Sequence, residues 1–370
     1  GSCPRSMLGR MPPRPEPDYT LRRAWRIDQA GSLARLKLIE EPLPPPATGE
    51  VQVEVEAIGV NFADVFACLG LYSATPKGSF VPGLECAGRV RRMGSGVTGW
   101  REGDAVIVLT RFGGYTTHLN VDARTLWPIP AGWTFEEAAA YPVQALTAWY
   151  GLLPLGNARA GSTVLVQSAA GGVGLNAMHA LQRMGAHPVA VVGSASKRDW
   201  LIERFALDPA TVVIRDAGLA KGLDAALARL GKRGFDVVLD AVYGEGFRLA
   251  FERLAPEGRY VLFGAADFMD GGRRPNFLKL AWRYLRRPRL DPLAMIPQNR
   301  GFLAFNLIWL WEQADRLPES MRATLALIVE RPHIGATYRF DEAHAALAAI
   351  QSGHTTGKLI LRSKLQSADG

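Results

Sequence analysis

The chain has 370 residues, which is too long for one comfortable hydrophobic core and predicts two domains. Hydrophobic residues make up 48% and charged residues 21%, as in a soluble globular enzyme, and no run of eighteen apolar residues predicts a membrane span. The net charge of +8 would suit an anionic partner, but the sequence has neither a zinc finger nor an aromatic–basic platform, which disfavours nucleic acid.

The first residues and the cysteines indicate the compartment. Residues 1–18 are rich in proline and open with a Gly-Ser that resembles an expression scar, so we expect them to form a mobile leader. Cys3, Cys68 and Cys86 lie far apart and form neither a zinc knuckle nor a disulfide framework. This pattern suits a reducing compartment and predicts a cytoplasmic protein.

Residues 19–144 have the pattern of a β-rich domain. Val51, Val53 and Val55 alternate with polar residues, as in a half-exposed antiparallel strand. Proline and glycine separate this run from other short β-type runs. We expect strands at 24–27, 33–38, 50–58, 88–92 and 104–109.

From residue 145 to 310 the pattern changes to strands that alternate with helices. The apolar run Val164–Val166 predicts a buried parallel strand, and the small-residue turn at 168–172 leads into a helix from Val173. This arrangement lets the backbone approach a dinucleotide pyrophosphate, although a variant of GxGxxG alone is equally compatible with a tight structural turn. Further strands, expected at 188–193, 211–214, 235–241 and 260–264, predict an α/β fold with a doubly wound parallel sheet.

The residues after the strand at 188–193 indicate the kind of dinucleotide. A site for NAD usually has Asp or Glu here, which binds the ribose 2′-hydroxyl. This chain instead has Ser194, Ser196 and Lys197, and Arg215 follows a later strand. Hydroxyls and cations suit a 2′-phosphate and therefore predict NADPH. The alternative is an ordinary polar loop with a solvated Lys–Arg pair.

The last part of the chain is basic and apolar before it returns to β structure. The basic segment 283–289, preceded by Arg273 and Arg274, is interpreted as a solvated helix face or a protected sheet edge, with a membrane-surface patch as the alternative. A strongly apolar run follows at 301–311. We expect a helix at 317–329 and then a strand, a helix and a strand, which return to the first domain, at 336–340, 342–351 and 357–362.

Several motifs occur in one order along the chain. They lie at 59–65, 69–72, 81–90, 103–104, 113–116 and, for the glycine turn, 169–174. Together they resemble the zeta-crystallin-like quinone oxidoreductase branch of the medium-chain dehydrogenase/reductase superfamily, and 299–306 is similar to the vesicle amine transport protein homologues within that branch.

The resemblance implies a two-domain architecture. A GroES-like β-rich catalytic domain would comprise 19–144 and 311–370, beside a Rossmann domain at 145–310, with the cofactor in the cleft between them. The resemblance also implies a homodimer joined by edge strands within 290–307. The apolar run at 301–311 would then form a dimer contact or a wall of the pocket.

The chain departs from the zinc-dependent members of this superfamily. Where those have a cysteine ligand, this chain has Asn61-Phe62, and where they have a His-Glu pair, it has Leu84-Glu85. A four-cysteine structural loop has no counterpart in the sequence, and the six histidines show no ligand spacing. We therefore expect no metal.

The resemblance assigns roles to individual residues. Asn61 would face the nicotinamide or the substrate, where its amide can donate to a developing oxyanion, and Tyr72 would be either the proton donor or an aromatic wall. Tyr115 is a weaker wall candidate, while Asp64 and Glu85 are expected to support loops by accepting backbone hydrogen bonds. The expected cofactor-binding residues are Asn61, Thr147, Ala170, Gly171, Gly172, Val173, Gly174, Ser194, Ser196, Lys197, Arg215, Phe263 and Gly264.

Two functions fit these residues. The first is a zinc-independent, NADPH-dependent oxidoreductase that transfers hydride to a quinone or an α,β-unsaturated carbonyl compound, with a biosynthetic enoyl reductase as a variant. The second is a nucleotide-binding protein that handles lipids or associates with membranes and has little reductase activity. The basic and apolar tail favours the second, and the intact cofactor residues favour the first.

Overall fold

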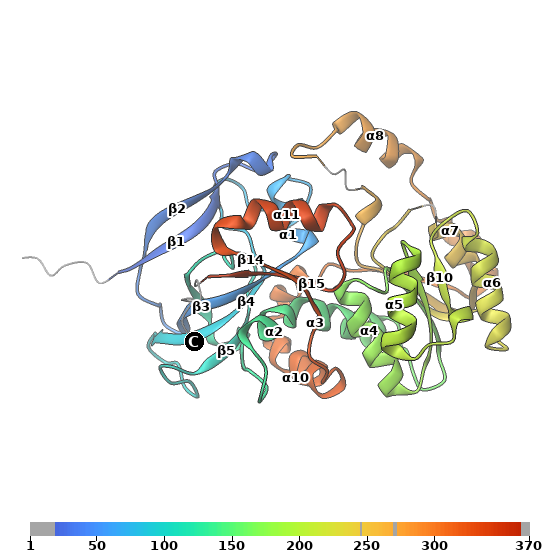
Figure 1. Cartoon of the computed structure of the whole chain (residues 1–370), viewed down its shortest axis with the longest axis horizontal. Helices are drawn as coiled ribbons and strands as arrows, with labels where there is room; N and C mark the ends of the chain where they lie inside the picture. The colour runs from blue at the N-terminus through green and yellow to red at the C-terminus, as the bar shows by residue number, and fades with distance from the viewer. Residues whose placement is uncertain (1–18, 245, 269–271, 364–370) are drawn as a thin grey trace, which may run out of the picture.

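The computed structural model describes residues 19–244, 246–268 and 272–363, and its main layers are two sheets joined by helices (Figure 1). The first sheet has the strand order β14-β15-β3-β4-β5-β7, with β6 also paired to β3. Its strands are β3 (Glu50–Val60), β4 (Glu85–Met93), β5 (Ala105–Leu109), β6 (His118–Asp122), β7 (Leu126–Pro128), β14 (Ile334–Arg339) and β15 (Lys358–Arg362).

A separate antiparallel hairpin, β1 (Thr20–Ile27) and β2 (Leu36–Leu43), lies beside this sheet. The prediction of a strand over 33–38 is wrong for its first three residues. Residues Leu33–Arg35 form a 3-10 turn because the side chain of Ser32 accepts a hydrogen bond from the amide of Ala34 and caps it. A side-chain cap of this kind competes with strand pairing, and the strand begins only at Leu36.

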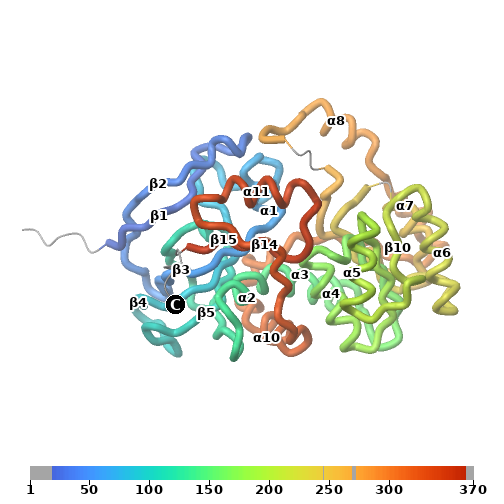
Figure 2. Tube along the Cα trace, in the orientation of Figure 1, coloured from blue at the N-terminus to red at the C-terminus, as the bar shows by residue number. Residues whose placement is uncertain are grey.

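The chain returns to the first sheet at its C-terminal end. β15 pairs antiparallel with β3, with Leu361 opposite Ile58, and β14 pairs parallel with β15. Helix α11 (Ala343–Gln351) connects these two strands and packs near α1 (Phe62–Cys68). The tube in Figure 2 shows red C-terminal segments beside blue N-terminal ones. Two segments far apart in sequence therefore form one layer.

The second sheet is parallel, with the strand order β10-β9-β8-β11-β12-β13, and the α/β fold expected from the sequence is confirmed. Its strands are β8 (Thr163–Gln167), β9 (His187–Val192), β10 (Val212–Ile214), β11 (Phe235–Asp240), β12 (Leu254–Leu262) and β13 (Gly301–Ala304). Alternate residues of β8 enter different cores, since Val164 and Val166 pack in one cluster and Leu165 in another. Burial on both faces explains the uninterrupted apolar run.

Helices cover the second sheet. They are α3 (Pro142–Tyr150), α4 (Gly172–Met184), α5 (Ala195–Phe205), α6 (Leu219–Arg229) and α7 (Gly246–Glu252). Helix α3 also contacts α10 (Leu317–Leu327), and α2 (Phe135–Ala140) packs on β3 and β4 of the first sheet. The strand order reverses beside β8, so the carboxyl end of β8 opens a crevice where ligands of such sheets usually bind.

A buried network of charged and polar side chains joins the first sheet to helices α1 and α3. Lys358, the first residue of β15, forms an ion pair with Glu85, the first residue of β4, and both side chains are fully buried. Asn61, which caps α1, donates from Nδ2 to Glu85 at 2.8 Å and accepts from Lys358 Nζ at 2.7 Å. The second carboxylate oxygen of Glu85 accepts the amide of Val143 in α3 at 2.7 Å. We call Lys358, Glu85 and Asn61 the buried triad.

The positive charge of Lys358 and the negative charge of Glu85 compensate each other inside the triad. Replacing Lys358 by methionine would leave the Glu85 carboxylate buried without a cation, which typically costs about 3–5 kcal/mol. We expect Lys358→Met to lower the free energy of unfolding in urea by that order. The double variant Lys358→Met/Glu85→Gln, which removes both charges, should recover a large part of the loss. Equal unfolding free energies for the single and double variants would contradict this account.

Candidate active site

A cleft of about 760 Å³ lies between the two sheets. From the first sheet and its helices it is lined by Asn61, Phe62, Tyr72 and Leu84, among others, and from the second by the glycine turn and the ends of the strands. Its lining includes these expected site residues: Asn61, Tyr72, Thr147, Ala170, Gly171, Gly172, Val173, Gly174, Lys197, Arg215, Phe263 and Gly264. The fold therefore brings most of the expected residues to one place.

The glycine turn needs its glycines for steric reasons. A Cβ at Gly174 would lie 2.5 Å from the carbonyl oxygen of Ser168 and 2.6 Å from Cα of Ala169. At Gly172 it would collide with the side chain of Gln144. The first turn of α4 is thus packed directly on Ser168, Ala169 and the α3 side chain of Gln144, with the first amides of α4 beside the cleft. Such a helix N-terminus attracts anions.

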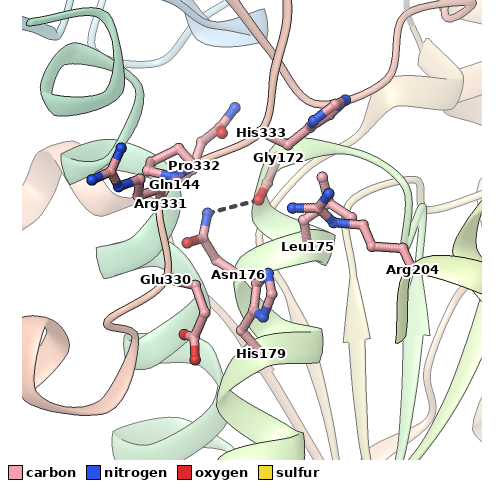
Figure 3. Close-up of a pocket in the computed structure, with 10 residues that line it drawn as sticks. All are labelled: Gln144, Gly172, Leu175, Asn176, His179, Arg204, Glu330, Arg331, Pro332 and His333. Atoms are coloured by element: carbon pink, nitrogen blue, oxygen red, sulfur yellow. Dashed lines mark hydrogen bonds between the residues drawn. The ribbon is translucent and has the colours of Figure 1, made fainter. Parts of the chain in front are cut away.

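A small cavity of about 10 Å³ lies behind this turn (Figure 3). In it Asn176 points toward Gly172 and donates from Nδ2 to the Gly172 carbonyl oxygen at 2.8 Å. The space is about that of a single water molecule, so it supports the turn and does not accommodate an organic ligand.

Two cations line the cleft on the same side as the glycine turn. Lys197 Nζ donates to the carbonyl oxygens of Gly353 at 2.8 Å and Thr355 at 2.9 Å, and Arg215 donates to the hydroxyl of Ser168 at 3.1 Å. Burial, and then the charge of Arg215, lowers the pKa of Lys197. Arg215 Nε is buried without a hydrogen-bond partner in the described part of the chain. A bound anion would satisfy both side chains.

The two serines expected at the 2′-phosphate lie next to Lys197 at the start of α5. Ser194 caps α5, where its hydroxyl accepts the amide of Lys197 at 3.3 Å and lies 3.0 Å from the Ser196 hydroxyl. Neither serine is among the residues that line the cleft. Arg198 points away and donates to carbonyl oxygens of Val212 and Pro209. The cations of the cleft are therefore Lys197 and Arg215.

Tyr72 and Asn306 meet at the apolar end of the cleft. The Tyr72 hydroxyl donates to Oδ1 of Asn306 at 2.6 Å. Burial raises the pKa of Tyr72 to about 12, although the hydrogen bond to Asn306 acts in the opposite direction. Thr147, also in the lining, donates to the carbonyl oxygen of Val143 at 2.6 Å. The phenol thus stays protonated near neutral pH and is held toward Asn306.

The structure corrects the expectation for Tyr115. This side chain is fully buried beneath the cleft, where its ring lies against Gly83, and it is not part of the lining. Its hydroxyl donates to Oδ2 of Asp64 at 3.0 Å, an oxygen that also accepts the amide of Asn61 at 2.8 Å. Desolvation raises the pKa of Asp64 to about 7. Asp64 and Glu85 accept backbone hydrogen bonds, as expected for residues that support loops.

Some lining residues were not identified from the sequence. Asn306 caps the turn after β13, and Gly353 and Thr355 belong to the loop before β15. For the apolar run at 301–311, dimer contact and pocket wall were open alternatives, and residues of the run line the cleft, namely Ala304, Phe305, Leu307, Ile308 and Trp311. A polar residue two positions after an edge strand of the parallel sheet was the available signal for Asn306.

Among the described residues, no group of three or more His, Cys, Asp or Glu side chains is placed to hold a metal ion. In the same part of the chain, no helix is both long enough and apolar enough to cross a bilayer.

Comparisons with known proteins agree on the family. A family model described as "Alcohol dehydrogenase GroES-like domain" matches residues 47–131, and one described as "Zinc-binding dehydrogenase" matches residues 210–361. The human "Synaptic vesicle membrane protein VAT-1 homolog" is 32% identical over 336 residues, which cover 90% of this chain and 84% of that protein.

Solved structures show the same architecture. The quinone oxidoreductase of Thermus thermophilus, described together with its NADPH complex, is 29% identical with a TM-score of 0.74, and the match covers 92% of this chain and 99% of that one. A mycobacterial protein complexed with NADPH is 26% identical with a TM-score of 0.78, and the match covers 93% of this chain and 100% of that one. The CurK enoyl reductase is 25% identical with a TM-score of 0.76, and the match covers 92% of this chain and 99% of that one. The chain belongs to the medium-chain dehydrogenase/reductase family of oxidoreductases, in the quinone oxidoreductase branch that includes the VAT-1 homologues.

Proposed function

We propose that the protein is a zinc-independent, NADPH-dependent reductase of quinones or α,β-unsaturated carbonyl compounds. One observation carries the proposal. A single cleft has the glycine turn and two cations toward one end, and an apolar wall with Asn61 and Tyr72 toward the other. This distribution suits a polyanionic dinucleotide whose reactive ring meets an apolar acceptor.

The residues present fit NADPH. The close approach of backbone at Gly174 leaves room for a pyrophosphate at the N-terminus of α4, where unpaired amides attract negative charge. The unpartnered Arg215 Nε and the neighbouring Lys197 suit a 2′-phosphate, and residues 193–198, directly after β9, include no carboxylate that would repel it. Both the mycobacterial relative and the Thermus enzyme have been solved with NADPH, which supports this choice.

The acceptor end of the cleft suits a conjugated substrate. Bound NADPH supplies the hydride. Asn61 has two amide hydrogens, of which one is donated to Glu85 at 2.8 Å and the other has only the Gly59 carbonyl oxygen, at 3.5 Å. The second hydrogen is therefore available to an oxyanion that develops on a quinone or enone. The buried triad holds the amide in place, since Lys358 binds its oxygen.

Assembly and location are part of the same proposal. The outer edge of β13 is unpaired in the described sheet, and this edge is where a homodimer would extend the sheet across two subunits. The homodimer and a cytoplasmic location stay predictions.

The preference for NADPH is tested at Lys197. Losing a charged hydrogen bond typically costs about 1.5–3 kcal/mol, which is roughly 10- to 100-fold in the dissociation constant. We expect Lys197→Ala to weaken NADPH binding by that factor and to leave NADH binding nearly unchanged, as measured by fluorescence titration. The control variant Lys221→Ala removes one positive charge from the exposed side of α6 and should alter the binding of neither NADPH nor NADH. Equal losses for both cofactors would place the 2′-phosphate elsewhere.

The role of Asn61 is tested by kinetics. Removing one donor to a developing oxyanion can cost roughly 2.7–4 kcal/mol of barrier, and the loss appears in kcat more than in KM. We expect Asn61→Ala to lower kcat about 100- to 1000-fold with quinones and enones. Lys358→Met disturbs the same triad but keeps the amide, so a smaller loss is expected there. If Asn61→Ala lowers the free energy of unfolding but leaves kcat of the folded protein unchanged, Asn61 acts only by supporting the structure.

Tyr72→Phe distinguishes an acid from a wall. Because the phenol proton is donated to Asn306 and its pKa is raised to about 12, we expect Tyr72 to act mainly as a wall. The variant keeps the ring, so turnover of both quinones and enones should stay within about threefold of the parent. A loss above tenfold confined to enones would instead identify Tyr72 as the proton donor. No turnover of any acceptor by the unmodified protein would favour the lipid-handling function.

A further inference from the structure

Helix α8 (Phe277–Arg286) presents an apolar face to solvent. Not one of its ten residues is buried, and Leu278 is 87% exposed. Phe277, Trp282, Tyr284 and Leu285 are each more than half exposed as well. In Figures 1 and 2 the helix stands apart from both sheets, at the top of the view. Leu293 and Ile296, shortly after it, are exposed to a similar degree.

The two kinds of side chain are segregated around the helix. At about 100° per residue, Lys279, Arg283 and Arg286 fall on one side, spaced at i, i+4 and i+7. The apolar residues occupy the rest of the circumference, including the adjacent positions 277, 278, 281, 282 and 285. Arg286 lies 3.9 Å over the Trp282 ring and Arg287 lies 3.7 Å over the Tyr284 ring. Cations therefore border the apolar face.

The segment is attached to the body at both ends. The carbonyl oxygen of Arg273 accepts the amide of Leu33 at 3.1 Å and the hydroxyl of Ser32 at 3.2 Å. The Tyr243 hydroxyl donates to the carbonyl oxygen of Pro288 at 2.8 Å. The helix between these attachments is held in position while its apolar face is left outside the core.

The charge of the segment indicates what covers this face. Between 272 and 290 the sequence has no Asp or Glu. Its cations are Arg273, Arg274, Lys279, Arg283, Arg286, Arg287 and Arg289. A second copy packed face to face would bring two such sets together, which like-charge repulsion opposes. Nucleic acid would match the charge but would leave Leu278 and Leu285 in water.

We propose that α8 docks on the surface of an anionic lipid bilayer, with its apolar face in the acyl boundary and its cations at the headgroups. At about 1.5 Å per residue, a ten-residue helix is too short to span a bilayer and would lie in its plane. Trp282 and Tyr284 have the ring chemistry that favours the membrane interface. This proposal does not depend on which acceptor the cleft reduces.

Vesicle flotation tests the docking directly. The full chain is mixed with vesicles of phosphatidylcholine alone or with about 30% phosphatidylserine, at low and at higher salt. We expect binding to the phosphatidylserine vesicles, and weaker binding as salt shortens the Debye length from about 30 Å at 0.01 M to about 8 Å at 0.15 M. Absence of binding to the anionic vesicles at low salt would overturn the proposal.

Variants test separately the contributions of the apolar residues and of the arginines to vesicle binding. Leu278→Asp/Leu285→Asp removes apolar contact, and Arg286→Glu/Arg287→Glu reverses charge; each should weaken vesicle binding about tenfold or more. Arg233→Glu/Arg248→Glu makes the same charge change at two exposed residues away from α8 and should bind nearly as the parent does. Reduction of a water-soluble quinone should be unchanged in all three, which shows that they fold.

Two results would contradict docking of the apolar face on lipid. If Leu278→Asp/Leu285→Asp converts a dimer to a monomer without lipid, and the parent shows no vesicle binding, the face is an interface between copies. If that variant binds anionic vesicles as well as the parent does, the arginines act alone and the apolar docking is wrong. Both are measured on the same samples by sedimentation velocity and flotation.

Discussion

The ion pair between Lys358 and Glu85 is the interaction on which the rest of the structure depends. The two residues are 273 positions apart, and both are fully buried. A charge without its partner at this depth would be strongly destabilising, so β15 and β4 have to meet for either side chain to be tolerated. The same pair holds the Asn61 amide and the start of α3. Closing the first sheet and positioning the Asn61 amide in the cleft therefore depend on the same ion pair.

The second constraint is the reversal of strand order beside β8. It opens a crevice at the carboxyl ends of the parallel strands, and the glycine turn lines this crevice. The C-terminal loop closes over the same crevice, because Lys197 donates to the Gly353 and Thr355 carbonyl oxygens. A phosphate at Lys197 would compete with these carbonyl oxygens. If the cofactor phosphate binds at Lys197 as proposed, cofactor binding and the position of this loop would be coupled through one ammonium group.

The exposed face of α8 runs against the tendency of apolar side chains to leave water. Most apolar side chains of the described strands follow that tendency, and the strands of both sheets contribute to buried clusters. A helix that is tethered at both ends and displays Leu278 and Trp282 is consistent with a surface that is completed by another partner. Its cations restrict the chemistry of that partner to something anionic.

Periodicity and composition by themselves determined the layers of this protein. The alternating valines of β3, the apolar run of β8 and the turn before α4 were predictable because local pattern reports which face is buried. Lys197 and Arg215 were predictable for a similar reason, since both follow strands of one parallel sheet. The start of β2 was not, because the Ser32 cap competes with strand pairing there.

Only the tertiary structure decided what each side chain contacts. Tyr115 and Tyr72 are of the same residue type, yet one is sealed against Asp64 and the other reaches Asn306, 234 residues away. Ser196 stands beside Lys197 in sequence but lies outside the cleft. Such outcomes depend on packing between segments distant in the chain, which local pattern does not encode. The sequence therefore specified which chemical groups are available, and the packing of the two sheets selected those that meet.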